Sequence, residues 1–531
     1  MRSEGRNSTR RRIWLYPILL LGSATAAVLV TLYMVDWFRW APVSGGEKPG
    51  PLMFFGYDPD TAQNALGNLA QVIAAVLGIV ITVVSIIVQL ASTRYTPRVA
   101  EMFFKDRTNL LILGFFIVAG IDAVWVSLSV TRSFIPAVSI TASLLLVTAS
   151  ILLMIPYFAY VFDFLDPEKL VARIEQQALA SALGRDQIGR GNIVPRQTRV
   201  LYSVEQLGDV SMNSVAQKDK LIAQGAVDAL KTLTVSYLPH KNGAEPGWFE
   251  VGPRLRQNPD FVSMSAESVD DLASQRVWLE WKVLRQYQAV FNEAIGQMPD
   301  MNYLVAINTR YIGEAALVAD DRPMIRLVIK FFNTYLRATL NAENIRIAYN
   351  TLNQYRQFGE KVIARGHDTL AVEIAGYFRY YSQIAHLKGL SFVVETVTYD
   401  LATLCEHAHA RRAPCHDPLL RVLLDLDRDA ETAEQEKMLR GVRKAQAKLA
   451  SYYLAAGDEP HARAIFEDMK GEPASRLASI RGELLAITAK DFWEVIDRGT
   501  NFDYMDETRK EHLKTFFSWF PTLQASPVAL A

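Results

Sequence analysis

The sequence predicts an all-α integral membrane protein, in which four transmembrane helices precede a large cytoplasmic α-helical domain built as a stack of helical hairpins. Three observations favour this fold class. The long apolar runs of the 531-residue chain are confined to its first third. One of them, residues 66–91, carries no charge and is long enough to cross a bilayer. The rest of the chain is more polar and repeats apolar residues at helical spacing.

Four apolar runs qualify as membrane spans, namely residues 13–35, 66–91, 110–130 and 134–162. At about 1.5 Å per residue, each can cross a hydrocarbon core roughly 30 Å thick. The first run could instead be a signal peptide, because arginines precede it and residues 24–26 resemble a cleavage site. The apolar run continues past that site for about ten residues, which favours an uncleaved anchor. The sequence therefore predicts a transmembrane domain over residues 13–165.

The charges of the loops predict the orientation. Residues 1–12 hold five arginines against one glutamate, and the loop after the second run is also basic. The basic residues of that loop are Arg94, Arg98, Lys105 and Arg107. Because Lys and Arg accumulate on the cytoplasmic side, we expect both termini in the cytoplasm. We also expect the basic loop to rest against anionic headgroups.

The polar residues of the second run follow a single line along the helix. They are Asn68, Gln71, Gly78, Thr82, Ser85, Gln89 and Ser92, and Ala75 completes the spacing. Steps of three and four residues place them on one helix face, which we call the seam. Such a face in lipid either packs against another helix or lines a water-filled path in an oligomer. The small and hydroxyl-bearing residues favour packing.

Asp122 is the only ionisable residue inside a predicted span. A charged side chain at the bilayer centre costs at least roughly 2.5 kcal/mol unless it is neutral or paired. One interpretation is a protonated Asp122 that is hydrogen-bonded to Gln71 or to another seam residue. The other is a proton or cation site on an ion path.

The remaining residues predict a helical subdomain over 166–241, a Gly/Pro-rich linker or hairpin over 242–262, and a helical-hairpin domain over 263–531. A short β-hairpin is expected around residues 248–251, and one continuous helix over 270–295. Helix pairs are broken at residues 320–323 and 366–368. Residues 446–466 resemble a tetratricopeptide-type hairpin with a turn at Gly457. A stack of such hairpins offers a face for another protein.

Two motifs in the later part of the chain could bind metal. Cys405, His407, His409, Cys415 and His416 are five possible zinc ligands within twelve residues, but their spacing matches no closed zinc site. The acids of residues 425–436 partly fit a calcium loop, but Ala430 stands where that loop needs glycine. Structural residues at helix ends are the favoured interpretation, so neither a metal nor a cofactor is predicted.

The composition and motifs disfavour several function classes. The 56 basic residues balance the 56 acidic ones, which leaves no net field for nucleic acid. The two cysteines form no disulfide framework, so a reducing compartment is favoured. The chain has no phosphate-binding glycine loop, no H-E-x-x-H and no nucleophile elbow. We therefore predict no enzyme activity and name no catalytic residue.

Residues 83–98, together with residues 103–107 and the span that follows, resemble a family of bacterial predicted membrane proteins of unknown function. The resemblance covers residues 65–165 and implies hydrophobic hairpins followed by a soluble region. Many members carry a Ser-Pro-x-x-Asn-Asp-Pro stretch, from which the comparable residues 211–220 depart. The resemblance implies a multi-pass protein of the bacterial cytoplasmic (inner) membrane and supplies no activity, substrate or catalytic residue.

Taken together, the predicted function is a membrane-anchored scaffold or sensor. Its expected partners are the lipid bilayer, further copies of the same chain bound through the seam, and a cytoplasmic protein bound by the helical domain. The alternative is an oligomeric ion channel or transporter lined by the seam, with Asp122 near the path.

Overall fold

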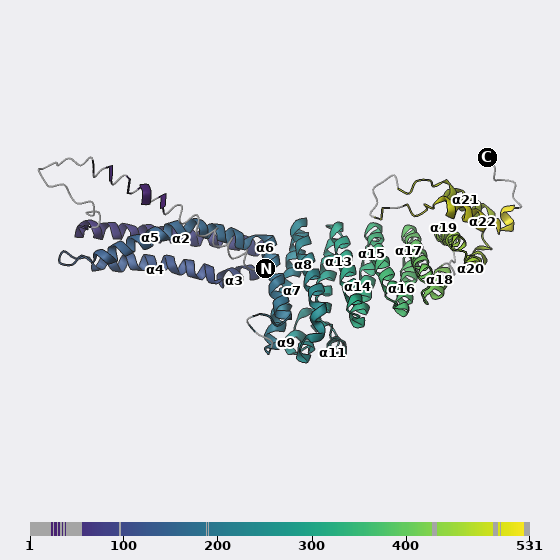
Figure 1. The fold of residues 1–531 in the computed structure, drawn as a ribbon, viewed down its shortest axis with the longest axis horizontal. Helices are drawn as coiled ribbons and strands as arrows, with labels where there is room; N and C mark the ends of the chain where they lie inside the picture. The colour runs from purple at the N-terminus through teal and green to yellow at the C-terminus, as the bar shows by residue number, and fades with distance from the viewer. Residues whose placement is uncertain are drawn as a thin grey trace. The chain divides into compact units, whose positions relative to one another are not determined.

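The computed structural model of the protein describes residues 56–94, 97–186, 188, 191–426, 433–491, 498–499 and 501–524, with isolated positions between 23 and 38. The chain divides into two compact units, Met1–Ala172 and Arg173–Ala531 (Figure 1). We call them the membrane unit and the tail unit. Helices account for 82% of the structure, and its described residues contain no strand. The all-α fold class is therefore confirmed, whereas the boundaries predicted inside the tail stay predictions.

Among the described residues, three helices of the membrane unit are long and apolar enough to cross a membrane. They are α2 (Pro59–Arg94), α4 (Arg107–Ser129) and α5 (Ala137–Leu165), and the short helix α3 (Pro97–Phe104) lies between α2 and α4 in the chain. They correspond to the second, third and fourth apolar runs. The first run, residues 13–35, falls outside the described residues except for isolated helical positions. The span predicted at the first run is therefore still a prediction.

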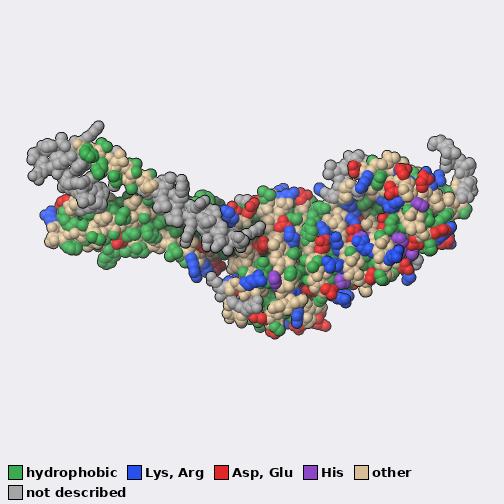
Figure 2. All heavy atoms as spheres, viewed as in Figure 1, with side chains coloured by type: hydrophobic (Ala, Val, Ile, Leu, Met, Phe, Trp, Pro, Cys, Tyr) green, Lys and Arg blue, Asp and Glu red, His purple; other side chains and the backbone are tan. Residues whose placement is uncertain are grey.

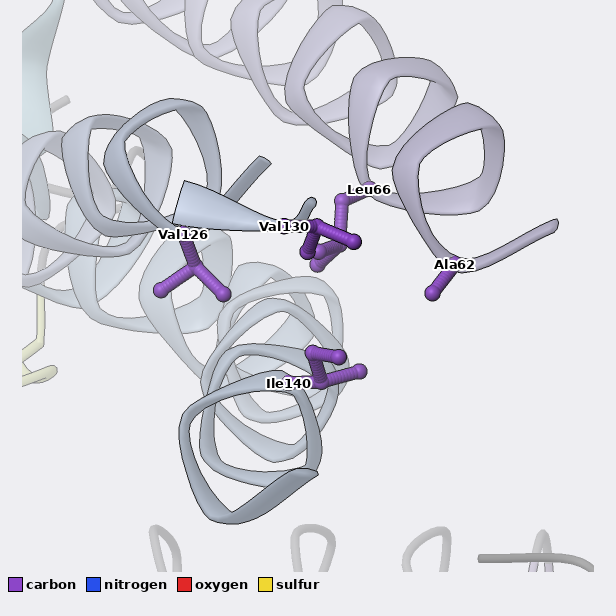
Figure 3. Packing of buried hydrophobic residues seen from close by; sticks show 5 residues of the cluster. All are labelled: Ala62, Leu66, Val126, Val130 and Ile140. Carbon is purple, nitrogen blue, oxygen red and sulfur yellow. The ribbon is translucent and has the colours of Figure 1, made fainter. Parts of the chain in front are cut away.

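Each of these three helices packs against the other two. Near the chain segment that joins α4 to α5, the contact is a small apolar cluster (Figure 3) of Ala62, Leu66, Val126, Val130 and Ile140. Around Phe103 of α3, which is fully buried, an aromatic contact with Tyr160 and Phe164 joins α3 to α5. These contacts fix which face of each helix is turned inward.

The tail unit is a succession of helices. After α6 (Pro167–Ala182) come α7 (Ile193–Ala216), α8 (Lys220–Tyr237), η2 (Leu238–Gly243), η3 (Pro246–Phe249), α9 (Pro253–Arg256), α10 (Pro259–Val262), α11 (Ala266–Ser274) and α12 (Trp278–Ala294). They are followed by α13 (Pro299–Val318), α14 (Arg322–Asn341), α15 (Ile345–Ala364), α16 (Asp368–Leu387), α17 (Ser391–Ala410) and α18 (His416–Leu424). The last helices are α19 (Ala433–Ala455), α20 (Glu459–Met469), α21 (Ala474–Ala486), α22 (Glu507–Ser518) and α23 (Pro521–Gln524).

Consecutive helices from α13 to α20 form pairs, and the pairs lie side by side (Figure 1). Helices α13, α15, α17 and α19 each pack on the next member of this series. The turns between helices use the left-handed backbone region, with φ of 49° at Asp320, 73° at Gly366 and 77° at Gly457. These three residues lie at the breaks that the sequence indicated, because a left-handed residue ends a helix and satisfies its last carbonyls.

Two local expectations were wrong. Residues 246–249 form the 3₁₀ helix η3 and not a β-hairpin. Here the amide nitrogen of Gln197 donates hydrogen bonds to the carbonyls of Trp248 and Glu250, at 3.0 and 2.8 Å, so these groups need no strand partner. The helix expected over 270–295 is interrupted at Arg276, whose φ is 59°. No glycine or proline marks that break, and burial of Trp278 accompanies it.

Candidate functional site

The seam of α2 faces away from the other described membrane helices. Its residues Asn68, Gln71, Gly78, Thr82, Ser85 and Gln89 are exposed, and Ser92 is half-buried. The buried face of α2 consists of Leu66, Ile73, Val80, Val84 and Val88, each at most 3% exposed. At about 100° per residue these two sets fall on opposite sides of the helix. A Cβ atom placed on Gly78 would meet no atom within 4 Å, so no described residue packs closely against the seam at this point.

The hydrogen-bonding groups of the seam are only partly satisfied. The Thr82 hydroxyl donates to the carbonyl of Gly78 at 2.8 Å, within the same helix. Within the described ranges, the side-chain amides of Asn68, Gln71 and Gln89 have no hydrogen-bond partner. Because an unsatisfied polar group is costly in hydrocarbon, this face requires protein or water beside it.

The faces beside the seam are apolar and exposed. Val72, Ile79, Ile86 and Leu90 are 45–64% exposed, and each follows a seam residue directly in sequence. Exposed apolar side chains also cover much of α4 and α5, as the green surface of the membrane unit shows (Figure 2). Such side chains are suited to lipid, so the seam is a polar stripe on an otherwise lipid-compatible surface.

Asp122 lies on α4 and is bonded to α5. The hydroxyl of Ser143, which is fully buried, donates to Asp122 Oδ2 at 2.5 Å. The expected partner, Gln71 or another seam residue, was wrong, because the packing of α4 on α5 brings Ser143 to this carboxyl group. Asp122 therefore joins two helices of the bundle, and its position is separate from the seam.

A second polar contact in the membrane unit was missed from the sequence. The Tyr157 hydroxyl donates to Asn109 Oδ1 at 2.7 Å, and the Tyr160 hydroxyl donates to Asp106. Asp106 also caps α4, accepting from the Thr108 amide at 2.9 Å. The sequence does contain a pattern that could have indicated these contacts. Asp106 and Asn109 lie at the start of one apolar run, and tyrosines lie near the end of the next run.

The basic loop consists of α3 and its flanking residues. Arg94 ends α2, Arg98 lies in α3, and Arg107 begins α4. Lys105 is exposed and forms an ion pair with Glu101 at 2.5 Å. Tyr95 and Thr96 lie outside the described residues. The predicted contact of this loop with headgroups stays a prediction.

Neither cysteine of the cysteine–histidine motif belongs to the group of described side chains whose ligand atoms lie close enough to share a metal ion. Cys405 and Cys415 are free and buried. Burial raises the pKa of both thiols, that of Cys415 to about 12. His407 lies beside Arg411, whereas the rings of His409 and His416 approach to 5.1 Å. In the calcium-like stretch, Asp427, Asp429 and Ala430 lie outside the described residues.

The tertiary fold adds to these two histidines three residues that the sequence motif did not include. Asp417, Asp458 and His461 join His409 and His416 between α17, α18 and α20. Burial, followed by the nearby His461 and His409, lowers the pKa of His416. The contact with His461 lowers the pKa of Asp417. Some 45 residues separate His416 from His461, so the sequence motif could not include both. The only sequence pattern that indicated a role for Asp458 and His461 in this cluster was their position at the start of a helix.

None of the curated proteins matches this chain. A solved structure described as a circular tandem repeat protein with novel repeat topology and enhanced subunit contact surfaces is 16% identical to it. That similarity covers 69% of this chain and 90% of the other, with a TM-score of 0.28.

Residues 10–222 match the model of the family described as "Predicted membrane protein (DUF2254)". The matched segment contains α2, α4 and α5, the described helices that are long and apolar enough to span a membrane. This match confirms the resemblance drawn from the sequence: over residues 10–222, the chain is similar to a family of predicted membrane proteins of unknown function.

Proposed function

We propose that this protein is a membrane-anchored scaffold or sensor, whose copies associate through the seam of α2 and whose tail unit binds a cytoplasmic protein. The exposed position of the seam, opposite the face that packs on α4 and α5, is the observation that carries this proposal. In lipid, helices associate through small residues and interhelical hydrogen bonds, and the seam is rich in both kinds of residue.

The spacing of the seam suits a second copy of α2. Its steps of three and four residues match the contact line of a left-handed helix pair. Gly78 leaves room for the backbone of the second helix, while Asn68, Gln71 and Gln89 supply amides that can hydrogen-bond across the pair. Each such bond contributes about 0.6–1.7 kcal/mol in a membrane protein.

Cysteine cross-linking in native membranes tests this association. Gln71→Cys and Gln89→Cys are expected to form disulfide-linked dimers on mild oxidation, because facing seam positions come within disulfide distance. Val72→Cys and Leu90→Cys are the matched controls, since each lies next to a seam residue and is exposed on the apolar side. They are expected to remain monomeric. Equal cross-linking of seam and control positions, or none at the seam, would contradict the association.

The proposed partner-binding role of the tail unit is supported by its exposed apolar side chains. Val318, near the end of α13, is 69% exposed, and Leu387, at the end of α16, is 79% exposed. A photoreactive residue at Leu387 is expected to yield a discrete adduct with another protein in cells. The same residue at exposed Lys514 should yield none. Identical adduct patterns at both positions would count against a specific partner surface.

The same exposed seam favours a second candidate, an oligomeric ion channel or transporter. Its polar residues extend along α2 from Asn68 to Gln89 without a charged side chain. A channel would give currents in a planar bilayer that Gln89→Leu reduces, and a silent bilayer under varied voltage, pH and tension would reject it. Because Asp122 is bonded to Ser143 on α5, Asp122→Asn is not expected to change currents through the seam.

A further inference from the structure

Side chains from two neighbouring helix pairs of the tail unit converge on one carboxylate oxygen. Asp417 Oδ1 lies 3.3 Å from Nδ1 of His416 and 3.1 Å from Nε2 of His461. His416 and Asp417 begin α18, and His461 lies in the first turn of α20. Each residue offers one ligand atom, and these atoms all lie within 4.8 Å of one another. Figure 2 shows histidine side chains at the surface over this region.

We propose that His416, Asp417 and His461 bind a divalent transition-metal ion, with Zn²⁺ as the best-fitting ion. Two imidazole nitrogens and one carboxylate are a donor set that Zn²⁺ prefers, whereas Ca²⁺ and Mg²⁺ prefer oxygen ligands throughout. Tetrahedral ligands about 2.0–2.1 Å from zinc lie about 3.3 Å from one another. The two nitrogen–oxygen distances already have this spacing. Each imidazole binds the ion through an unprotonated nitrogen, Nδ1 in His416 and Nε2 in His461.

The other ring nitrogen of each histidine is held by a second group. His461 Nδ1 lies 2.6 Å from Asp458 Oδ2, and His416 Nε2 lies 2.7 Å from the hydroxyl of Tyr453, which is fully buried. Metal-binding histidines commonly have such partners, which fix the tautomer and turn the free lone pair towards the metal. His409 bonds to the same carboxylate oxygen of Asp458 at 3.1 Å and steadies it.

One side of the cluster is buried in the protein, and the other side is open to solvent. His416 is 9% exposed and gives a fixed ligand, while Asp417 is 62% exposed and gives the ion a route of entry. Three protein ligands leave one tetrahedral position for water. Since the ligands come from α18 and α20, the bound ion joins the α17–α18 pair to the α19–α20 pair.

The test uses the full-length chain without an affinity tag, purified in detergent and stripped with a chelator. Titration with Co²⁺ is expected to produce visible d–d absorption that saturates at one ion per chain and disappears when Zn²⁺ is added. Zn²⁺ is also expected to raise the unfolding temperature. His461→Ala and Asp417→Asn should each weaken Co²⁺ binding by more than about tenfold, and Asp458→Asn by about 10–100-fold.

His240→Ala is the matched control, because His240 is exposed and lies outside this cluster. It should bind Co²⁺ as the unchanged chain does. His461 and Asp417 are both partly exposed, so their variants are expected to fold, and circular dichroism checks this. No Co²⁺ or Zn²⁺ binding by the unchanged chain would overturn the proposal. Equal affinity in the folded His461→Ala variant and the His240→Ala control would overturn it too.

Discussion

Asp400→Ala is expected to destabilise the tail unit by about 3–5 kcal/mol, since removing one partner of a buried ion pair leaves the other charge uncompensated. Asp400 lies on α17 and is 1% exposed. Its two carboxylate oxygens accept from Nη1 and Nη2 of Arg498 at 2.5 and 3.1 Å. Arg356 Nε on α15 lies 3.1 Å from Asp400 Oδ1. The carboxylate thus connects two stacked helices to a segment 98 residues further along the chain.

In Asp400→Ala, the charge left buried without a partner would be mainly that of Arg498. Its side chain is 5% exposed, donates to the Tyr349 carbonyl at 2.9 Å and lies 4.3 Å from the centre of the Tyr349 ring. These contacts hold the guanidinium away from water when Asp400 is missing. Arg356 is affected less, because it is also paired with Glu360.

Urea unfolding of the full-length chain in detergent, followed by circular dichroism, measures the change. Glu511→Ala is the control, because Glu511 belongs to an exposed pair with Lys514 and should change stability by less than about 0.5 kcal/mol. The double variant Asp400→Leu with Arg498→Met should recover part of the lost stability, because replacing both charged residues with apolar ones leaves no unpaired buried charge. A loss no larger than that of the control would show that this pair is not important for stability.

Lys241→Met is the second change expected to cost about 3–5 kcal/mol. Lys241 lies in η2, and its Nζ is 2.7 Å from Glu280 Oε1 and 2.6 Å from Asp321 Oδ2. Glu280 on α12 is 1% exposed, so methionine would leave this carboxyl group buried without a cation. The pair also ties η2 to α12 and to the start of α14. Fluorescence of the buried Trp248 and Trp278 during urea unfolding reports the loss.

The contribution of Lys241 should depend on pH. Burial alone would lower the pKa of Lys241, but attraction to Glu280 and Asp321 outweighs burial and raises this pKa above its ordinary value of 10.5. Because folding raises the pKa, the stabilisation is fully present below the unfolded value and is lost as the pH rises through the folded one. The difference between the unchanged chain and Lys241→Met should therefore narrow above pH 10.5.

Lys470→Met is the matched control for Lys241→Met. Lys470 pairs with Glu467 at the surface, where both side chains are at least 60% exposed, so its loss should change stability by less than about 1 kcal/mol. Equal destabilisation by the two substitutions would mean that the burial of Lys241 has no energetic consequence.

Features with a local physical cause were predictable from the sequence. The three described membrane helices are long apolar runs in which Asp122 is the one charged residue of a predicted span, and apolar length decides whether a helix can span a bilayer. Asp320, Gly366 and Gly457 lie at predicted breaks and adopt positive φ. The break at Arg276 was missed, because a residue without any special turn preference takes the left-handed conformation there.

Features that depend on partners distant in the chain were not predictable. Periodicity identified the seam of α2, but only packing showed that Leu66 and Val80 face inward while Gln71 and Gln89 face outward. The sequence indicated that burying the Asp122 carboxyl group in the membrane costs free energy. Its partner Ser143 could not be predicted, because the contact depends on the register between α4 and α5, which the sequence of neither helix alone specifies.

By itself, the sequence determined that this chain is helical, that its first third can enter a membrane, and that α2 carries one polar face. These properties follow from hydrophobicity and spacing within single segments. Tertiary structure alone decided that this face is left exposed by the described neighbouring helices, and that His461 reaches His416 and Asp417 from another helix pair. The physical reason is that these contacts depend on how helices pack against one another. Packing brings together residues that are far apart in the chain, and no pattern within a single segment predicts which of them will meet.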